Sequence, residues 1–200
     1  MIDTKRLAEW MDERGLPGKG APLEATYLSG GTQNEIYKLV RDDFTSVIRI
    51  PPKAAPADRD NGIIREWRII EGLDGTDVPH TAAIAACEDT SVLGRAFYLM
   101  GFVDGWSPMD HRDGWPAPFD NDPEARAGLA YQLAEGIGLL SKVDWKAQGL
   151  EGLGRPDGFH DRQVDRWTDS SSGSKPARSR AWTSPPSGYR ITGRSTTSRA

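Results

Sequence analysis

A glycine-rich stretch, LSGGTQNEIYKL over residues 28–39, contains residue types that could hold the phosphates of a ligand. Glycines let the backbone turn closely over phosphate oxygens, and freed N–H groups and small polar side chains can hydrogen-bond them. The candidate residues are Gly30, Gly31, Thr32, Gln33 and Asn34. The alternative is an ordinary hairpin turn, because the stretch lacks the Lys-Ser/Thr of a Walker loop and does not precede a helix.

Two charged residues further along the chain could complete a phosphate site. Arg49 lies within the β-branched stretch TSVIRI, and Glu66 lies in an expected helix over residues 61–73. A cation on a half-buried strand usually needs a partner. In protein-kinase-like folds a strand cation paired with a helix carboxylate fixes the α- and β-phosphates. The alternative is a surface arginine and an unrelated helical carboxylate.

The strand end LMGFVDG, residues 99–105, is a candidate contact for a nucleotide base. A strand that leads through apolar residues into an Asp-Gly turn can offer backbone N–H and C=O groups to an adenine edge. The candidate residues are Met100, Gly101, Phe102 and Val103. The alternative is a core strand that ends in a turn.

The elements that must position these residues form a mostly antiparallel sheet with a packed helix. Apolar alternation predicts strands over residues 23–29, 35–40, 45–50, 91–94 and 96–102. Helical periodicity predicts helices over residues 4–14, 61–73 and 123–140, with Asp3 as the first N-cap and Pro123 opening the last. The order is not the βαβ alternation of a dinucleotide-binding fold, so we expect the α+β class.

Length and composition fit a substantial core. The chain has 200 residues, 37 % of them hydrophobic, and seven are tryptophan. A single cysteine, Cys87, excludes an internal disulfide framework and fits a reducing compartment. The net charge of −4 gives no basic signature for nucleic acid, and no apolar run is long enough for a bilayer. We therefore expect a cytoplasmic protein with no nucleic-acid or membrane partner.

The composition changes near Trp167. Residues 168–200 carry a net charge of +5, whereas residues 1–167 carry −9. Abundant serine and threonine without apolar periodicity predict a disordered tail. Our hypothesis is that this tail is out-of-frame translation of a GC-rich gene. A polyanion-binding role for its basic residues is a disfavoured alternative, because the tail has no ordered basic face.

Residues 24–167 resemble the N-terminal part of the aminoglycoside phosphotransferase-like (choline-kinase-like) kinases, in a branch also fused to some acyl-CoA dehydrogenases. The matching segments are the glycine-rich stretch, VIRIPP, IIREWRIIEGL, FYLMGFVDG, LLSKVDW and GLGRPDGFHDRQVDRW. The resemblance implies a bilobal kinase-like fold. Its N-lobe, with the N-terminal helix, would occupy residues 1–103, and an incomplete helical C-lobe would occupy residues 104–167 before the tail over 168–200.

The resemblance also implies ATP and Mg²⁺ as cofactors and a small hydroxylated acceptor. Gly30 to Asn34 would cover the phosphates, Arg49 would replace the strand lysine with Glu66 as its partner, and Met100 to Val103 would be the adenine-contacting hinge. Arginine departs from the lysine of protein kinases. Its planar fork can still bridge phosphate and carboxylate, but the two residues are not interchangeable.

The family's catalytic loop, H-G-D-x-x-x-x-N, does not occur in this sequence. His111-Arg112-Asp113 imitates its start, but Pro118 stands where the asparagine should be, and His160-Asp161 lacks the intervening glycine. We therefore assign no catalytic and no metal-ligating residue. We expect an inactive, truncated phosphotransferase or, alternatively, a non-catalytic nucleotide-binding module of the pseudokinase type.

The helix over residues 123–140 carries an apolar face that a complete C-lobe would cover. The face is formed by Leu129, Leu133, Ile137 and Leu140. Without such a cover it predicts self-association.

Overall fold

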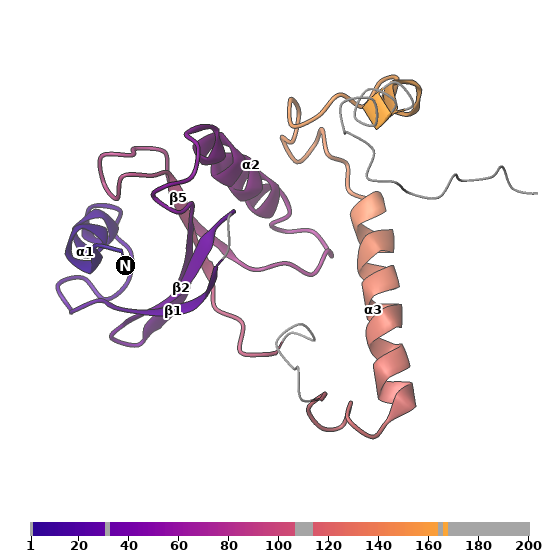
Figure 1. Cartoon of the computed structure of the whole chain (residues 1–200), viewed down its shortest axis with the longest axis horizontal. Helices are drawn as coiled ribbons and strands as arrows, with labels where there is room; N and C mark the ends of the chain where they lie inside the picture. Colours follow the sequence, from indigo (N-terminus) through magenta and orange to yellow (C-terminus); the bar gives the residue numbers. More distant parts are fainter. Residues whose placement is uncertain (1, 31–32, 107–113, 164–165, 168–200) are drawn as a thin grey trace, which may run out of the picture. The chain divides into compact units, whose positions relative to one another are not determined.

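The structure is a computed structural model that describes residues 2–30, 33–106, 114–163 and 166–167 (Figure 1). The chain divides into two compact units, Met1–Gly154 and Arg155–Ala200. The first unit contains all the strands and helices given bounds below. The expected tail over residues 168–200 and the His111-Arg112-Asp113 triplet lie outside the described residues.

Five antiparallel strands form one sheet. The strands are β1 (Glu24–Gly30), β2 (Glu35–Arg41), β3 (Phe44–Ile50), β4 (Ala83–Cys87) and β5 (Phe97–Gly101). They lie in the order β1-β2-β3-β5-β4. The helix α2 (Asp58–Gly72) connects β3 to β4. The sheet and its helices confirm the α+β class.

Helix α1 (Thr4–Glu13) packs on one face of the sheet. Its N-cap is Asp3, whose carboxylate accepts a hydrogen bond of 3.1 Å from the backbone N–H of Arg6. The helix ends before Gly15, which has a φ of 69°. Its buried residues, Leu7, Trp10 and Met11, join a core with Tyr37, Leu39, Ile48, Ile50, Phe97 and Leu99 of the sheet.

Helix α2 packs on the opposite face (Figure 1). Successive strand residues point to opposite sides of a sheet, so Val47 and Arg49 face away from the core that contains Ile48. The Trp67 ring of α2 lies 6.1 Å from the Tyr98 ring of β5 on this side. We call this side the α2 face, because α2 contacts β4 and β5 there.

The strand expected over residues 91–94 is wrong. This segment forms a turn in which Gly94 has a φ of 86°, and the fourth strand lies earlier, at Ala83–Cys87. Val92 and Leu93 are apolar because they pack against the core from the turn. The strand sequence AIAAC is rich in alanine, which is depleted in strands, so its pattern gave little signal.

Helix α3 (Pro123–Ser141) begins as the sequence predicted. Asp122 caps it by accepting hydrogen bonds from the N–H groups of Glu124 and Ala125 at 2.8 and 3.1 Å. None of its side chains is buried. No helix among the described residues combines the length and apolar character needed to cross a bilayer.

Candidate nucleotide-binding site

A salt bridge between Arg49 and Glu66 joins β3 to α2. Arg49 Nε lies 2.9 Å from Glu66 Oε2, and the two side chains are 32 % and 40 % exposed. Because successive side chains of β3 point to opposite faces of the sheet, Arg49 lies on the α2 face, where it meets Glu66 of α2. The pairing expected from the sequence is therefore present. Because both side chains remain partly exposed, a ligand can reach the pair.

Tyr98 completes this cluster, although sequence reasoning did not single it out. It is the cross-strand partner of Arg49, so both residues lie on the same face. Its hydroxyl donates to Glu66 Oε2 at 3.4 Å. The pKa of Tyr98 is raised to about 12, mainly by burial of the hydroxyl, and the neighbouring Arg49 acts in the opposite direction. The hydroxyl thus stays protonated at neutral pH and donates to the carboxylate.

The glycine-rich loop contacts the same arginine through Asn34. With its amide oriented to satisfy both polar groups, the Asn34 oxygen accepts from Arg49 Nε at 3.1 Å and from Nη2 at 3.0 Å. In this orientation the amide nitrogen donates to the Gln33 carbonyl at 2.7 Å. Gly30 ends β1 opposite Glu35, whereas the candidate residues Gly31 and Thr32 lie outside the described residues. Asn34, at the end of the loop, therefore lies against Arg49.

Gln33 has a second contact, with α2. Its side-chain oxygen accepts a hydrogen bond from Nη1 of Arg59, in the first turn of that helix. Sequence reasoning did not find Arg59, because only the folded chain brings α2 beside the β1–β2 loop. Two consecutive loop residues thus contact arginines from two different elements.

The hinge candidates follow one another at the end of β5. Met100 and Gly101 belong to the strand, and the Gly101 N–H donates to the Ala82 carbonyl at 2.9 Å. Phe102 and Val103 lie beyond it, and Val103 is 67 % exposed. The Lys38 ammonium lies 4.2 Å from the centre of the Phe102 ring. The Gly101 N–H is thus already occupied, and Phe102 and Val103 lie beyond the end of the strand.

The strand register sets the distance between these groups. Arg49 pairs with Tyr98 and Ser46 pairs with Gly101, so the hinge lies three residues along β3 from the arginine. Three residues of extended strand span about 10 Å. The hinge candidates and Arg49 therefore lie at opposite ends of the same stretch of β3.

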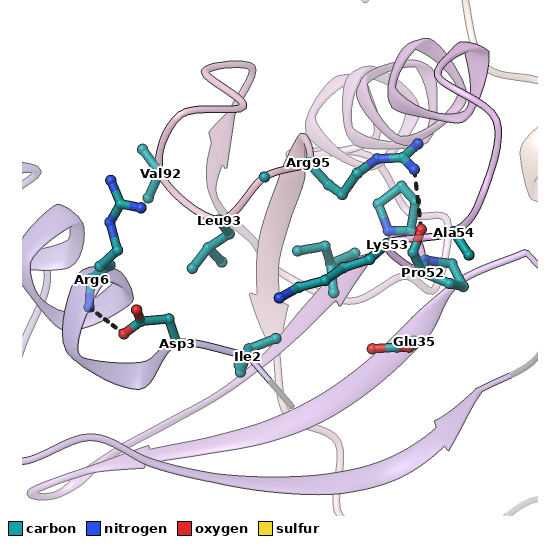
Figure 2. A pocket seen from close by; sticks show the side chains of 13 residues that line it. Ile2, Asp3, Arg6, Glu35, Pro52, Lys53, Ala54, Val92, Leu93 and Arg95 are labelled. Carbon is teal, nitrogen blue, oxygen red and sulfur yellow. Dashed lines mark hydrogen bonds between the residues drawn. The ribbon is translucent and has the colours of Figure 1, made fainter.

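A pocket of about 700 Å³ lies on the other side of the sheet, and its lining residues differ from those of the candidate site (Figure 2). It is lined by the start of α1, the end of β3 and the turn before β5. Three of its charged side chains make contacts within the chain: Asp3 caps α1, and Glu35 accepts a 2.7 Å hydrogen bond from the Tyr37 hydroxyl. Arg95 donates to Asp60 Oδ1 at 3.0 Å. Neither Arg49 nor Glu66 lines this pocket, so it is separate from the candidate site.

His160 and Asp161, the described pair that resembles the start of the catalytic loop, are both exposed. Among the described residues, no group of three or more His, Cys, Asp or Glu side chains is placed to hold a metal ion.

Comparison with known families matches residues 24–184 to the phosphotransferase enzyme family. The chain belongs to this family. A crystal structure of a putative aminoglycoside phosphotransferase from Ralstonia eutropha JMP134 is similar to it, with 34 % identity and a TM-score of 0.68. The match covers 88 % of this chain and 50 % of the other. The sheet and its helices thus have the kinase-like fold of this family.

Curated relatives are similar over the same region. Human acyl-CoA dehydrogenase family member 11 is 29 % identical over 171 residues, covering 84 % of this chain and 21 % of the relative. The probable acyl-CoA dehydrogenase IBR3 of Arabidopsis thaliana is 28 % identical, with 82 % and 20 % covered. The chain therefore spans about a fifth of the length of these relatives.

Proposed function

We propose that this phosphotransferase-family chain binds ATP on the α2 face. The observation that carries the proposal is Arg49, which Glu66 holds at 2.9 Å while Asn34 of the loop faces the same guanidinium. A guanidinium has five donors in a planar fork and can contact a carboxylate and a phosphate together. Phosphates under the loop over residues 30–34 would therefore meet a cation that is already oriented.

The base would lie at the other end of the site. Phe102 and Val103 leave the sheet about 10 Å from Arg49 along β3, and Val103 is exposed. Their backbone groups would hydrogen-bond the adenine edge, while Met100 and Val47, which pair across β3 and β5, would form the apolar wall. In family members that transfer phosphate, a small hydroxylated acceptor would receive the γ-phosphate.

Mg²⁺, when bound with ATP, would neutralise charge on the phosphates. The described residues offer no carboxylate cluster that fits a metal ion, and none of them is proposed as a ligand. The residues present would bind and orient the phosphates through Arg49, Asn34 and the loop backbone.

Phosphoryl transfer also needs a residue that orients the attacking hydroxyl. The sequence contains no H-G-D-x-x-x-x-N loop to supply it. We propose that this chain by itself binds the nucleotide without transferring phosphate, as a nucleotide-binding module of the pseudokinase type. The same contacts would serve catalysis only where the missing groups are supplied.

Thermal unfolding with ATP tests this function. At an ATP concentration about a hundredfold above Kd, binding should raise the unfolding temperature by roughly 5–10 °C. Arg49→Ala should abolish the shift in unfolding temperature. Arg49→Lys should reduce it, because an ammonium lacks the planar set of N–H donors of a guanidinium. Arg65→Ala is the control, since Arg65 is an exposed arginine of α2. An ATP-dependent shift that survives Arg49→Ala would contradict the proposed site.

A coupled assay for ADP release tests the second part of the proposal. No ADP should form above the buffer control when ATP, Mg²⁺ and a panel of small hydroxylated compounds are present. Steady ADP formation by the wild-type chain would show that it carries transfer groups that its sequence does not reveal.

A further inference from the structure

Arg59 is the second arginine that reaches the loop from a neighbouring element. It belongs to the first turn of α2, and its Nη1 donates to Gln33 Oε1. The next loop residue, Asn34, faces Arg49 on β3. The two guanidinium groups therefore meet adjacent residues of the loop that would cover the phosphates.

The contact between Arg59 and Gln33 is one that a phosphate could replace. Both side chains are exposed, so their hydrogen bond contributes little to folding. A side-chain amide is a neutral acceptor, whereas a phosphate oxygen carries charge and forms a stronger, shorter hydrogen bond with a guanidinium. Gln33 thus holds Arg59 beside the loop without competing strongly against an anion.

The surroundings of Arg59 also favour a phosphate. Of the two acidic residues in the first turn of α2, Asp60 is already occupied. Its Oδ1 accepts from Arg95 Nε at 3.0 Å and from the Ala96 N–H at 2.9 Å. Asp58 is exposed to solvent, which screens its charge. The N-cap residue Ala57 provides no capping side chain that would neutralise the positive end of the helix.

We propose that Arg59 is a second phosphate-binding residue of this site, which leaves Gln33 and contacts the outer phosphates when ATP binds. The proposal rests on the function proposed above and extends it to the recognition of a nucleoside triphosphate. Arg49 would contact the phosphates from the sheet, and Arg59 would contact them from α2.

Isothermal titration of the full chain with ATP and with adenosine tests the role of Arg59. Arg59→Ala should weaken ATP binding roughly tenfold, the loss of one hydrogen bond to a charged group. Adenosine binding should not change, because adenosine has no phosphate. Arg59→Lys should recover part of the affinity. Arg65→Ala, on the same helix, should bind both ligands like the wild type.

AMP distinguishes a phosphate contact from a purely structural role. If Arg59 binds the outer phosphates, Arg59→Ala should weaken the binding of ATP but not that of AMP, which lacks them. If Arg59 only holds the loop in place, Arg59→Ala should weaken the binding of ATP and AMP equally. That result would overturn the proposal, as would an Arg59→Ala variant that binds ATP like Arg65→Ala.

Failure of this proposal can be separated from failure of the proposed function. If the wild-type chain binds neither ATP nor adenosine, the nucleotide site itself is wrong, and the role of Arg59 falls with it. If the wild-type chain binds ATP more tightly than adenosine and Arg59→Ala keeps this difference, the nucleotide site stands but the phosphate contact of Arg59 does not. Thermal unfolding of each variant without ligand would show that the substitutions leave the fold intact.

Discussion

At the scale of the residue, Arg49 connects three parts of the candidate site. Its guanidinium contacts Glu66 of α2 and, through two of its nitrogens, the Asn34 oxygen of the loop. The ammonium of a lysine is a compact point charge and cannot offer the same planar set of donors. Arginine at this position therefore couples the loop to the strand–helix pair through one side chain. A partly exposed ion pair adds little to stability, so its value lies in orientation.

Tyr98 provides a residue-scale prediction about pH. Burial raises its pKa to about 12, above the ordinary tyrosine value of 10.0, so the folded chain holds this proton more tightly than the unfolded chain. The stabilisation is fully present below about pH 10 and is lost as the pH rises through about 12. Urea unfolding of Tyr98→Phe between pH 9 and about 12 should show a smaller loss of unfolding free energy than the wild type.

Tyr131→Phe is the matched control for this prediction. Tyr131 is 76 % exposed, so its hydroxyl lies outside the core. The control should follow the wild-type pH dependence. If Tyr98→Phe also follows the wild-type curve, burial does not favour the neutral hydroxyl as described.

At the scale of the element, Arg95 fixes the segment that leads into α2. The side chain is 6 % exposed. Besides its bond to Asp60, it donates to the carbonyl groups of Pro52, Ala55 and Pro56 at distances of 3.1, 2.6 and 2.9 Å. These contacts determine where α2 begins, and therefore where Glu66 and Arg59 lie relative to the sheet.

Arg95→Ala should accordingly destabilise the fold. It leaves Asp60 without its cation and three carbonyl groups without this donor, which costs about 3 kcal/mol of unfolding free energy. Urea denaturation measures the change, and Arg14→Ala is an exposed-arginine control expected to change stability by less than about 1 kcal/mol. A loss for Arg95→Ala as small as that of the control would mean that the contacts do not hold the segment.

At the scale of the whole molecule, α3 exposes an apolar face. Leu133, Ile137 and Leu140 are 68 %, 61 % and 50 % exposed. Leu129, the fourth residue of the face expected from the sequence, is partly covered. Apolar helix faces of this kind are normally buried against another element. We therefore predict that the chain self-associates through this face.

Light scattering after size exclusion tests the prediction for α3. The wild-type chain should show an apparent mass that rises with concentration, and Ile137→Glu should lower it, because a buried charge opposes an apolar contact. Gln132→Glu is the control, since Gln132 is an exposed polar residue of the same helix. A wild-type chain that stays monomeric at every concentration would contradict self-association.

Much of the fold could be predicted from the sequence, because its signals are local. The strands β1, β2 and β3 follow apolar alternation, and α1 and α3 begin at the capping residues Asp3 and Asp122. The strand at Ala83–Cys87 could not be found in this way. Its alanine-rich sequence has weak strand propensity, and pairing with β5 decides its conformation.

For the candidate site, the sequence by itself determined the chemical groups. A glycine-rich turn, Arg49 and Glu66 can be recognised from residue type and expected element, because alternation and helical periodicity fix which residues share a face. The sequence also determined that no H-G-D-x-x-x-x-N loop is present.

Only the tertiary structure decided which other side chains join the site. Tyr98 enters through the register of β3 and β5, and Arg59 enters because the segment held by Arg95 starts α2 beside the loop. Both contacts join residues more than 25 positions apart, which no local pattern encodes. Cross-strand register and helix-on-sheet packing are non-local properties that arise when the chain buries its core.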